Sequence, residues 1–176
     1  RSLDGLVVDT ECRWDLLGGL VVGGRATEER IDRELDRDDT ATGRVHAAAT
    51  RAAVPAPEAK AAAWKSVVEE SGLPNAIQAA VIGGFTRVRD RSLLEPFVEP
   101  YFESITRIWA ERTNEMATQI VIGLYPSIVG TQAVLDRTEA WLVTGSEEPA
   151  LRRLVLEGRD GVARALRGQA LDRSRG

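Results

Sequence analysis

The fold is decided by residues 92–109, SLLEPFVEPYFESITRIW, in which apolar side chains recur at the spacing of one helical face. The apolar members of that face are Phe97, Tyr101, Ile105, Ile108 and Trp109. Ser92 and Glu95 stand at the spacing of a capping box, which predicts a helix start. Pro96 fits the first helical turn, whereas Pro100 is expected to kink or restart the helix because it lacks an amide hydrogen.

Helical periodicity also dominates the sequence on both sides of this segment. The expected start residues of the other helices are Thr10, Thr27, Thr40 or Thr42, Pro57, Pro74, Thr113, Thr131 and Pro149. The β-like run Leu6-Val7-Val8 is too short to carry a sheet. The pattern predicts an all-α protein of about nine helices, each roughly 10–20 residues long. Because the loops are short, we expect antiparallel pairs that stack into a HEAT-like or armadillo-like superhelix with a concave face, as one domain over residues 1–176.

Three local features carry further expectations about these helices. The pair Gly83-Gly84 is expected to end the helix that precedes it. Gly158 and Gly161 lie inside the last helical pattern, and we expect a bend there because glycine weakens a helix. The stretch Glu28–Asp39 carries seven acids and three arginines, so it is interpreted as an exposed helix and loop.

The composition is that of a soluble globular protein. The 176 residues are 43% hydrophobic and 28% charged, with no long apolar run and no recognisable signal peptide. A net charge of −4 argues against nucleic acid as the main partner, and no membrane partner is expected. One cysteine excludes an internal disulfide and favours the cytoplasm. The chain opens on Arg1 instead of methionine, so we expect it to be a fragment of a larger protein.

Histidine and cysteine are too scarce for the common hydrolytic sites. The chain has one histidine, His46, and one cysteine, Cys12, which is expected to be a small buried apolar residue. A zinc site usually takes two or three such ligands, and a nucleophilic triad needs a histidine beside the nucleophile. We therefore predict no catalytic residue and no metal ligand in this chain, which leaves open whether it is an enzyme by itself.

Two groups of residues are candidates for binding. His46, flanked by Arg44, is interpreted as a packed or surface side chain, or as part of a concave groove that contacts a peptide. The C-terminal arginines, including Arg152, Arg153 and Arg159, are interpreted as a solvated face with cations near a helix end. They are also compatible with nucleic-acid binding, or with a cavity that attracts a substrate carboxylate.

Several stretches together resemble a known protein family. They are DDTATGR (38–44), EAKAAAW (58–64), LPNAIQ (73–78), VIGGF (81–85), IGLYP (122–126) and LRRLVLEGRDGV (151–162). In their order and number they resemble the C-terminal helical domain of actinobacterial-type aminopeptidase N, a zinc metallo-aminopeptidase of the gluzincin type. The resemblance extends from about Leu6 to Ala170.

The resemblance implies a role for this chain beside a catalytic domain. In that family a central domain carries the zinc motif H-E-x-x-H and a Gly-x-Met-Glu-Asn segment, and neither motif is in this sequence. The resemblance implies a C-terminal lid that closes the active-site chamber and restricts access to short peptides, with the zinc ion in the upstream catalytic domain. The implied partners are that domain and the peptide substrates. The alternative is a free-standing HEAT-like adaptor that binds other proteins.

Overall fold

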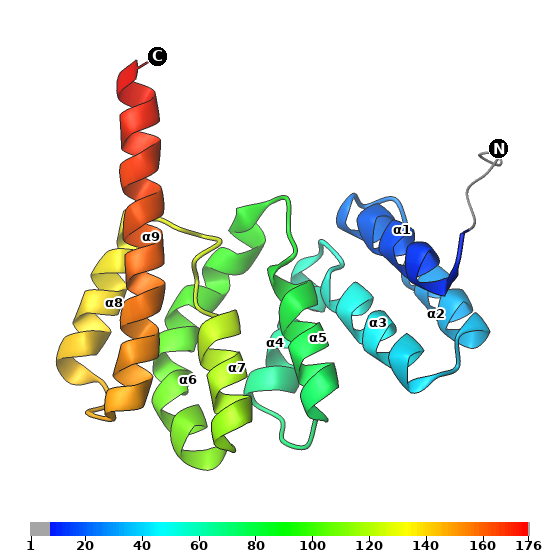
Figure 1. The fold of residues 1–176 in the computed structure, drawn as a ribbon, viewed down its shortest axis with the longest axis horizontal. Coiled ribbons are helices and arrows are strands. Elements are labelled where there is room, and N and C mark those ends of the chain that lie inside the picture. Colours follow the sequence, from blue (N-terminus) through cyan, green and yellow to red (C-terminus); the bar gives the residue numbers. More distant parts are fainter. Residues whose placement is uncertain (1–7, 176) are drawn as a thin grey trace.

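The computed structural model describes residues 8–175, and these residues form nine α-helices and one 3₁₀ helix (Figure 1). The helices are α1 (Thr10–Val22), α2 (Glu28–Arg37), α3 (Ala41–Ala52), α4 (Pro57–Val68), α5 (Asn75–Thr86), the 3₁₀ helix η1 (Arg91–Phe97), α6 (Val98–Glu111), α7 (Asn114–Gly123), α8 (Gln132–Thr144) and α9 (Pro149–Arg175). The prediction of an all-α fold is confirmed. Leu6 and Val7 of the β-like run lie outside the described residues.

The helices follow one another across the molecule in two layers. Helices α3, α5, α7 and α9 pack against one another in that order, and α4, α6 and α8 each pack on the helix that follows them. Figure 1 shows α1–α3 at one end of this row and α8 and α9 at the other. The arrangement is consistent with the predicted helical stack, whereas a specifically HEAT-like superhelix stays a prediction.

The apolar residues gather into two clusters. The larger one runs from α3 to α9 and includes the central side chains Tyr101, Ile105 and Ile108, all of them buried as the sequence pattern predicts. The smaller one joins α1, α2 and α3, and its buried members are Trp14, Leu17, Val21, Ile31, Ala47 and Ala53. The first three helices therefore have a small core of their own beside the main one.

The predicted capping box at Ser92 is wrong. Residues Arg91–Phe97 form a 3₁₀ helix, and the Asp90 carboxylate accepts hydrogen bonds from the Ser92 amide at 3.0 Å and from its hydroxyl at 2.7 Å. Asp90 is thus the N-cap of the 3₁₀ helix, and Ser92 lies inside that helix. Pro96 disfavours α conformation at Glu95, and the α-helix begins at Val98. The change from 3₁₀ to α helix thus comes two residues before Pro100, and α6 is continuous through Pro100.

Two glycine predictions can be compared with the helices: α5 ends at Thr86, two residues after the Gly83-Gly84 pair, and α9 is one continuous helix through Gly158 and Gly161. Gly84 lies inside α5, and a Cβ there would collide with the Ala49 carbonyl of α3. Helix α9 is continuous through Gly158, where an added Cβ would lie 2.7 Å from the ring of Tyr125. Both glycines serve the close approach of a neighbouring element, and a helical glycine of this kind is retained for packing.

Candidate functional site

The N-terminal helices are joined by a polar network around Asp38, at the C-terminal end of α2. The indole of Trp14 donates to the Asp38 carboxylate at 2.9 Å, and the Thr40 hydroxyl donates to it at 2.8 Å. These two hydrogen bonds, the first above all, lower the pKa of Asp38. The Thr40 hydroxyl also accepts from the Gly43 amide at 2.9 Å, so Thr40 is the N-cap of α3. One carboxylate therefore ties α1, α2 and α3 together.

His46 is packed against the first of these helices. Its ring stacks on Trp14 with 5.6 Å between the centroids and 15° between the planes. Its Nε2 atom lies 3.2 Å from the carboxylate of Glu11. The neighbouring Arg44 is exposed and pairs with Asp39 at 2.8 Å. Both side chains thus have partners within their own helix group, and His46 also lines a shallow cleft of about 300 Å³ between α3 and α5.

The three C-terminal arginines have different surroundings on α9. Arg152 donates to the Leu142 carbonyl at 2.8 Å and to the Ser146 carbonyl at 3.3 Å, so it satisfies carbonyls at the end of α8. Arg153 is exposed and lies 3.8 Å from the Glu157 carboxylate. Arg159 pairs with the carboxylate of Asp160 at 2.9 Å and with that of Glu139 at 3.0 Å. Those two partners raise its pKa, with Asp160 as the largest cause.

The structure does not bring the predicted groove residues together. His46 and Arg44 lie on α3, whereas Arg152, Arg153 and Arg159 lie on α9, at the other end of the row (Figure 1). His46 lines the cleft between α3 and α5, and none of the three α9 arginines lines that cleft. Contact of either group with a peptide stays a prediction.

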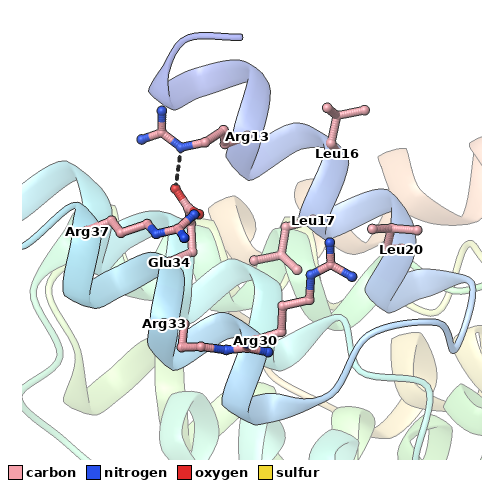
Figure 2. A pocket seen from close by; sticks show the side chains of 8 residues that line it. All are labelled: Arg13, Leu16, Leu17, Leu20, Arg30, Arg33, Glu34 and Arg37. Atoms are coloured by element: carbon pink, nitrogen blue, oxygen red, sulfur yellow. Dashed lines mark hydrogen bonds and ion pairs between the residues drawn. The ribbon is translucent and has the colours of Figure 1, made fainter. Parts of the chain in front are cut away.

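A cleft of about 500 Å³ lies between α1 and α2 (Figure 2). Its lining residues are Arg13, Leu16, Leu17, Leu20, Arg30, Arg33, Glu34 and Arg37. Glu34 is only 8% exposed and accepts from the Nε atom of Arg13 at 2.6 Å. The interpretation of Glu28–Asp39 as an exposed segment is therefore wrong at Glu34 and Asp38, which are buried together with the apolar Ile31. These three positions follow the helical spacing of three, four and seven residues, which is the signal that could have identified them.

A second cleft, of about 560 Å³, lies along α3 and α4. Its floor is formed mainly by small side chains, namely Ala48, Ala52, Ala56, Ala59, Ala62 and Ala63. Glu28, Arg51 and Glu58 contribute charged groups to the same cleft. The face of α3 that carries Ala48 and Ala52 therefore borders this cleft.

Lys60 is a buried cation that the sequence interpretation missed. Its side chain is fully buried, and the ammonium donates to the carbonyls of Ala52 at 2.7 Å and Phe85 at 2.9 Å. A longer contact of 3.3 Å reaches the Gly84 carbonyl. Burial lowers the pKa of Lys60 from its ordinary value of 10.5 to about 8. The lysine precedes Trp64 by four residues and Val67 by seven, so it lies on the buried face of α4.

The described residues contain no group of three or more histidine, cysteine, aspartate or glutamate side chains that would hold a metal ion. The zinc ion implied by the resemblance thus has no fitting set of ligands in residues 8–175, and no reaction step is assigned to them. Within the same residues, no helix is both long enough and apolar enough to span a membrane.

Comparison with known proteins identifies the family of the chain. Residues 1–164 match the family described as ERAP1-like C-terminal domain. Over 172 residues the chain is 51% identical to the Aminopeptidase N of Streptomyces lividans. This alignment covers 98% of the chain but 20% of the relative, so the chain spans about a fifth of the relative's length. The resemblance found in the sequence is confirmed, and the chain belongs to the ERAP1-like C-terminal domain family.

Proposed function

We propose that this chain is the non-catalytic C-terminal domain of a zinc-dependent aminopeptidase. It closes the active-site chamber and restricts access to short peptides. One observation carries the proposal: nearly the whole chain is 51% identical to an aminopeptidase N of which it spans only a fifth. The catalytic zinc and the residues that bind the peptide's amino terminus then belong to the remainder of the polypeptide. The proposed location of the enzyme is the cytoplasm.

The packing of the chain supports a role as a rigid wall. Two layers of helices share a continuous apolar core from α3 to α9. Buried polar groups are also tied to neighbouring helices, since Tyr101 donates to the Val121 carbonyl at 2.8 Å and Lys60 bridges α3 and α5. A rigid wall excludes folded proteins from a chamber by size and separates the reacting groups from bulk solvent, apart from the water that hydrolysis consumes.

Removal of the domain from the larger polypeptide tests this proposal. The full polypeptide and a version that lacks this chain are compared for zinc content and for kcat/KM on peptides of increasing length. We expect both versions to hold zinc and cleave a dipeptide, with the preference for short peptides lost in the truncated version. An unchanged length preference in an active truncated enzyme would contradict the lid role. Peptidase activity of the isolated chain would contradict its non-catalytic assignment.

A further inference from the structure

The cleft between α1 and α2 combines an apolar row with a basic row. Leu16 and Leu20 lie four residues apart on α1, so they stand one helical turn apart on the same face. Leu16 is 56% exposed and therefore presents apolar surface to the cleft. On α2, Arg30 and Arg33 are three residues apart and share a face in the same way. Figure 2 shows Arg30 extending from α2 toward the leucines of α1.

The side chains that line the cleft carry more basic than acidic groups, although Arg33 also donates to the Glu29 carbonyl at 3.2 Å. Four arginines line the cleft against one carboxylate, that of Glu34. Glu34 is already shared, at 2.6 Å from Arg13 and 3.6 Å from Arg37. Within residues 8–175, no carboxylate oxygen lies within 4.0 Å of Arg30 or Arg33. Because α2 as a whole carries five carboxylates and three arginines, the excess of positive charge is confined to the side chains that line the cleft, and there it favours an anionic group.

We propose that the α1–α2 cleft binds an acidic amphipathic helix. The apolar side chains of the bound helix pack on Leu16 and Leu20, and its carboxylates pair with Arg30 and Arg33. A helix is the matching shape because both rows have its repeat of three to four residues. Carboxylates one turn apart on such a helix are spaced like the two guanidinium groups, and arginine binds a carboxylate through two parallel hydrogen bonds. This inference uses only the geometry of α1 and α2 and is independent of the proposed lid role.

A designed peptide tests the proposal directly. The probe is a fluorescein-labelled, helix-stabilised peptide of about 18 residues, built of glutamate, leucine and alanine so that glutamates line one face and leucines the next. A second peptide has the same composition in scrambled order, and therefore the same charge without the two faces. Binding to the chain is measured by fluorescence anisotropy at physiological salt, where non-specific attraction is screened.

Matched variants separate the cleft from bulk charge. The R30E/R33E variant reverses the two cleft arginines, and R164E/R167E makes the same change in charge at two exposed arginines of α9. We expect saturable binding of the patterned peptide, weakened at least about tenfold by R30E/R33E and by less than about twofold by R164E/R167E. The neutral variant R30Q/R33Q and the variant L16Q are expected to weaken binding as well. Circular dichroism confirms that each variant is folded.

Three results would overturn the proposal. The first is the absence of saturable binding of the patterned peptide. The second is an equal loss of affinity in R30E/R33E and R164E/R167E, and the third is equal binding of the scrambled peptide. The last two would show that net charge alone attracts the probe.

Discussion

Replacement of Lys60 by methionine tests the role of the buried ammonium. Methionine keeps an unbranched apolar stem in the core, but it removes the donor to the Ala52 and Phe85 carbonyls. Those carbonyls end α3 and α5, where helix dipoles place partial negative charge. Each buried acceptor left without a donor costs about 1–3 kcal/mol. At neutral pH this loss of stability is offset, because K60M no longer buries the positive charge of Lys60.

The pH dependence separates these two contributions. In the unfolded chain Lys60 has its ordinary pKa of 10.5, whereas in the folded chain its pKa is about 8. Between these values the unfolded state binds more protons, so the contribution of Lys60 to the free energy of unfolding rises with pH. The full shift corresponds to about 3 kcal/mol. We therefore expect the stability advantage of the wild type over K60M to grow by about 2–3 kcal/mol between pH 7 and pH 10.

Urea unfolding followed by tryptophan fluorescence at several pH values measures this difference. The matched control is K65M, which removes the other lysine of the chain; Lys65 is an exposed residue of α4 that lies 3.8 Å from Glu70. K65M is expected to show no such growth with pH. Burial raises the pKa values of Tyr101 and Tyr125, so their ionisation affects all variants alike and cancels in the comparison. A wild-type advantage over K60M that stays constant from pH 7 to pH 10 would refute the reasoning.

Three further substitutions test the packing. G158A is expected to destabilise the chain by about 1–3 kcal/mol, because its Cβ would lie 2.7 Å from the Tyr125 ring; thermal unfolding measures the change, and an unchanged Tm would contradict this packing. G161A, on the same helix with nothing within 4 Å of an added Cβ, is expected to stabilise it by up to about 1 kcal/mol, and a lower Tm would show that this position is not open. W14F removes the hydrogen bond that most strongly lowers the pKa of Asp38, so it is expected to reduce the loss of stability as the pH falls below about 4. An acid unfolding curve parallel to that of the wild type would exclude this role of Trp14.

Local sequence signals located most of the helices. Thr40 and Thr113 cap α3 and α7 through their hydroxyls, and Pro57 is the first residue of α4, as their types predict. Signals failed where a neighbour decided the outcome. Asp90 caps the 3₁₀ helix in place of Ser92, and the glycine at position 84 of α5 allows the close approach of α3. Neither effect is contained in the local periodicity.

The candidate site was harder to predict than the fold, because it depends on contacts between distant residues. His46 stacks on Trp14, which lies 32 positions earlier, and Lys60 reaches the Phe85 carbonyl 25 positions later. The cleft arginines Arg30 and Arg33 lie in a stretch whose charge indicated only exposure. Their position opposite the leucines of α1 follows from how both helices pack on α3.

The reading frame upstream of Arg1 tests the central claim most directly. Sequencing of the coding region that precedes this chain shows whether it continues into a catalytic domain. The account predicts a frame several times longer than this chain, with a Gly-x-Met-Glu-Asn segment followed by an H-E-x-x-H motif. A frame that starts within a few residues of Arg1 would contradict the assignment to an aminopeptidase. The chain would then be a free-standing helical adaptor.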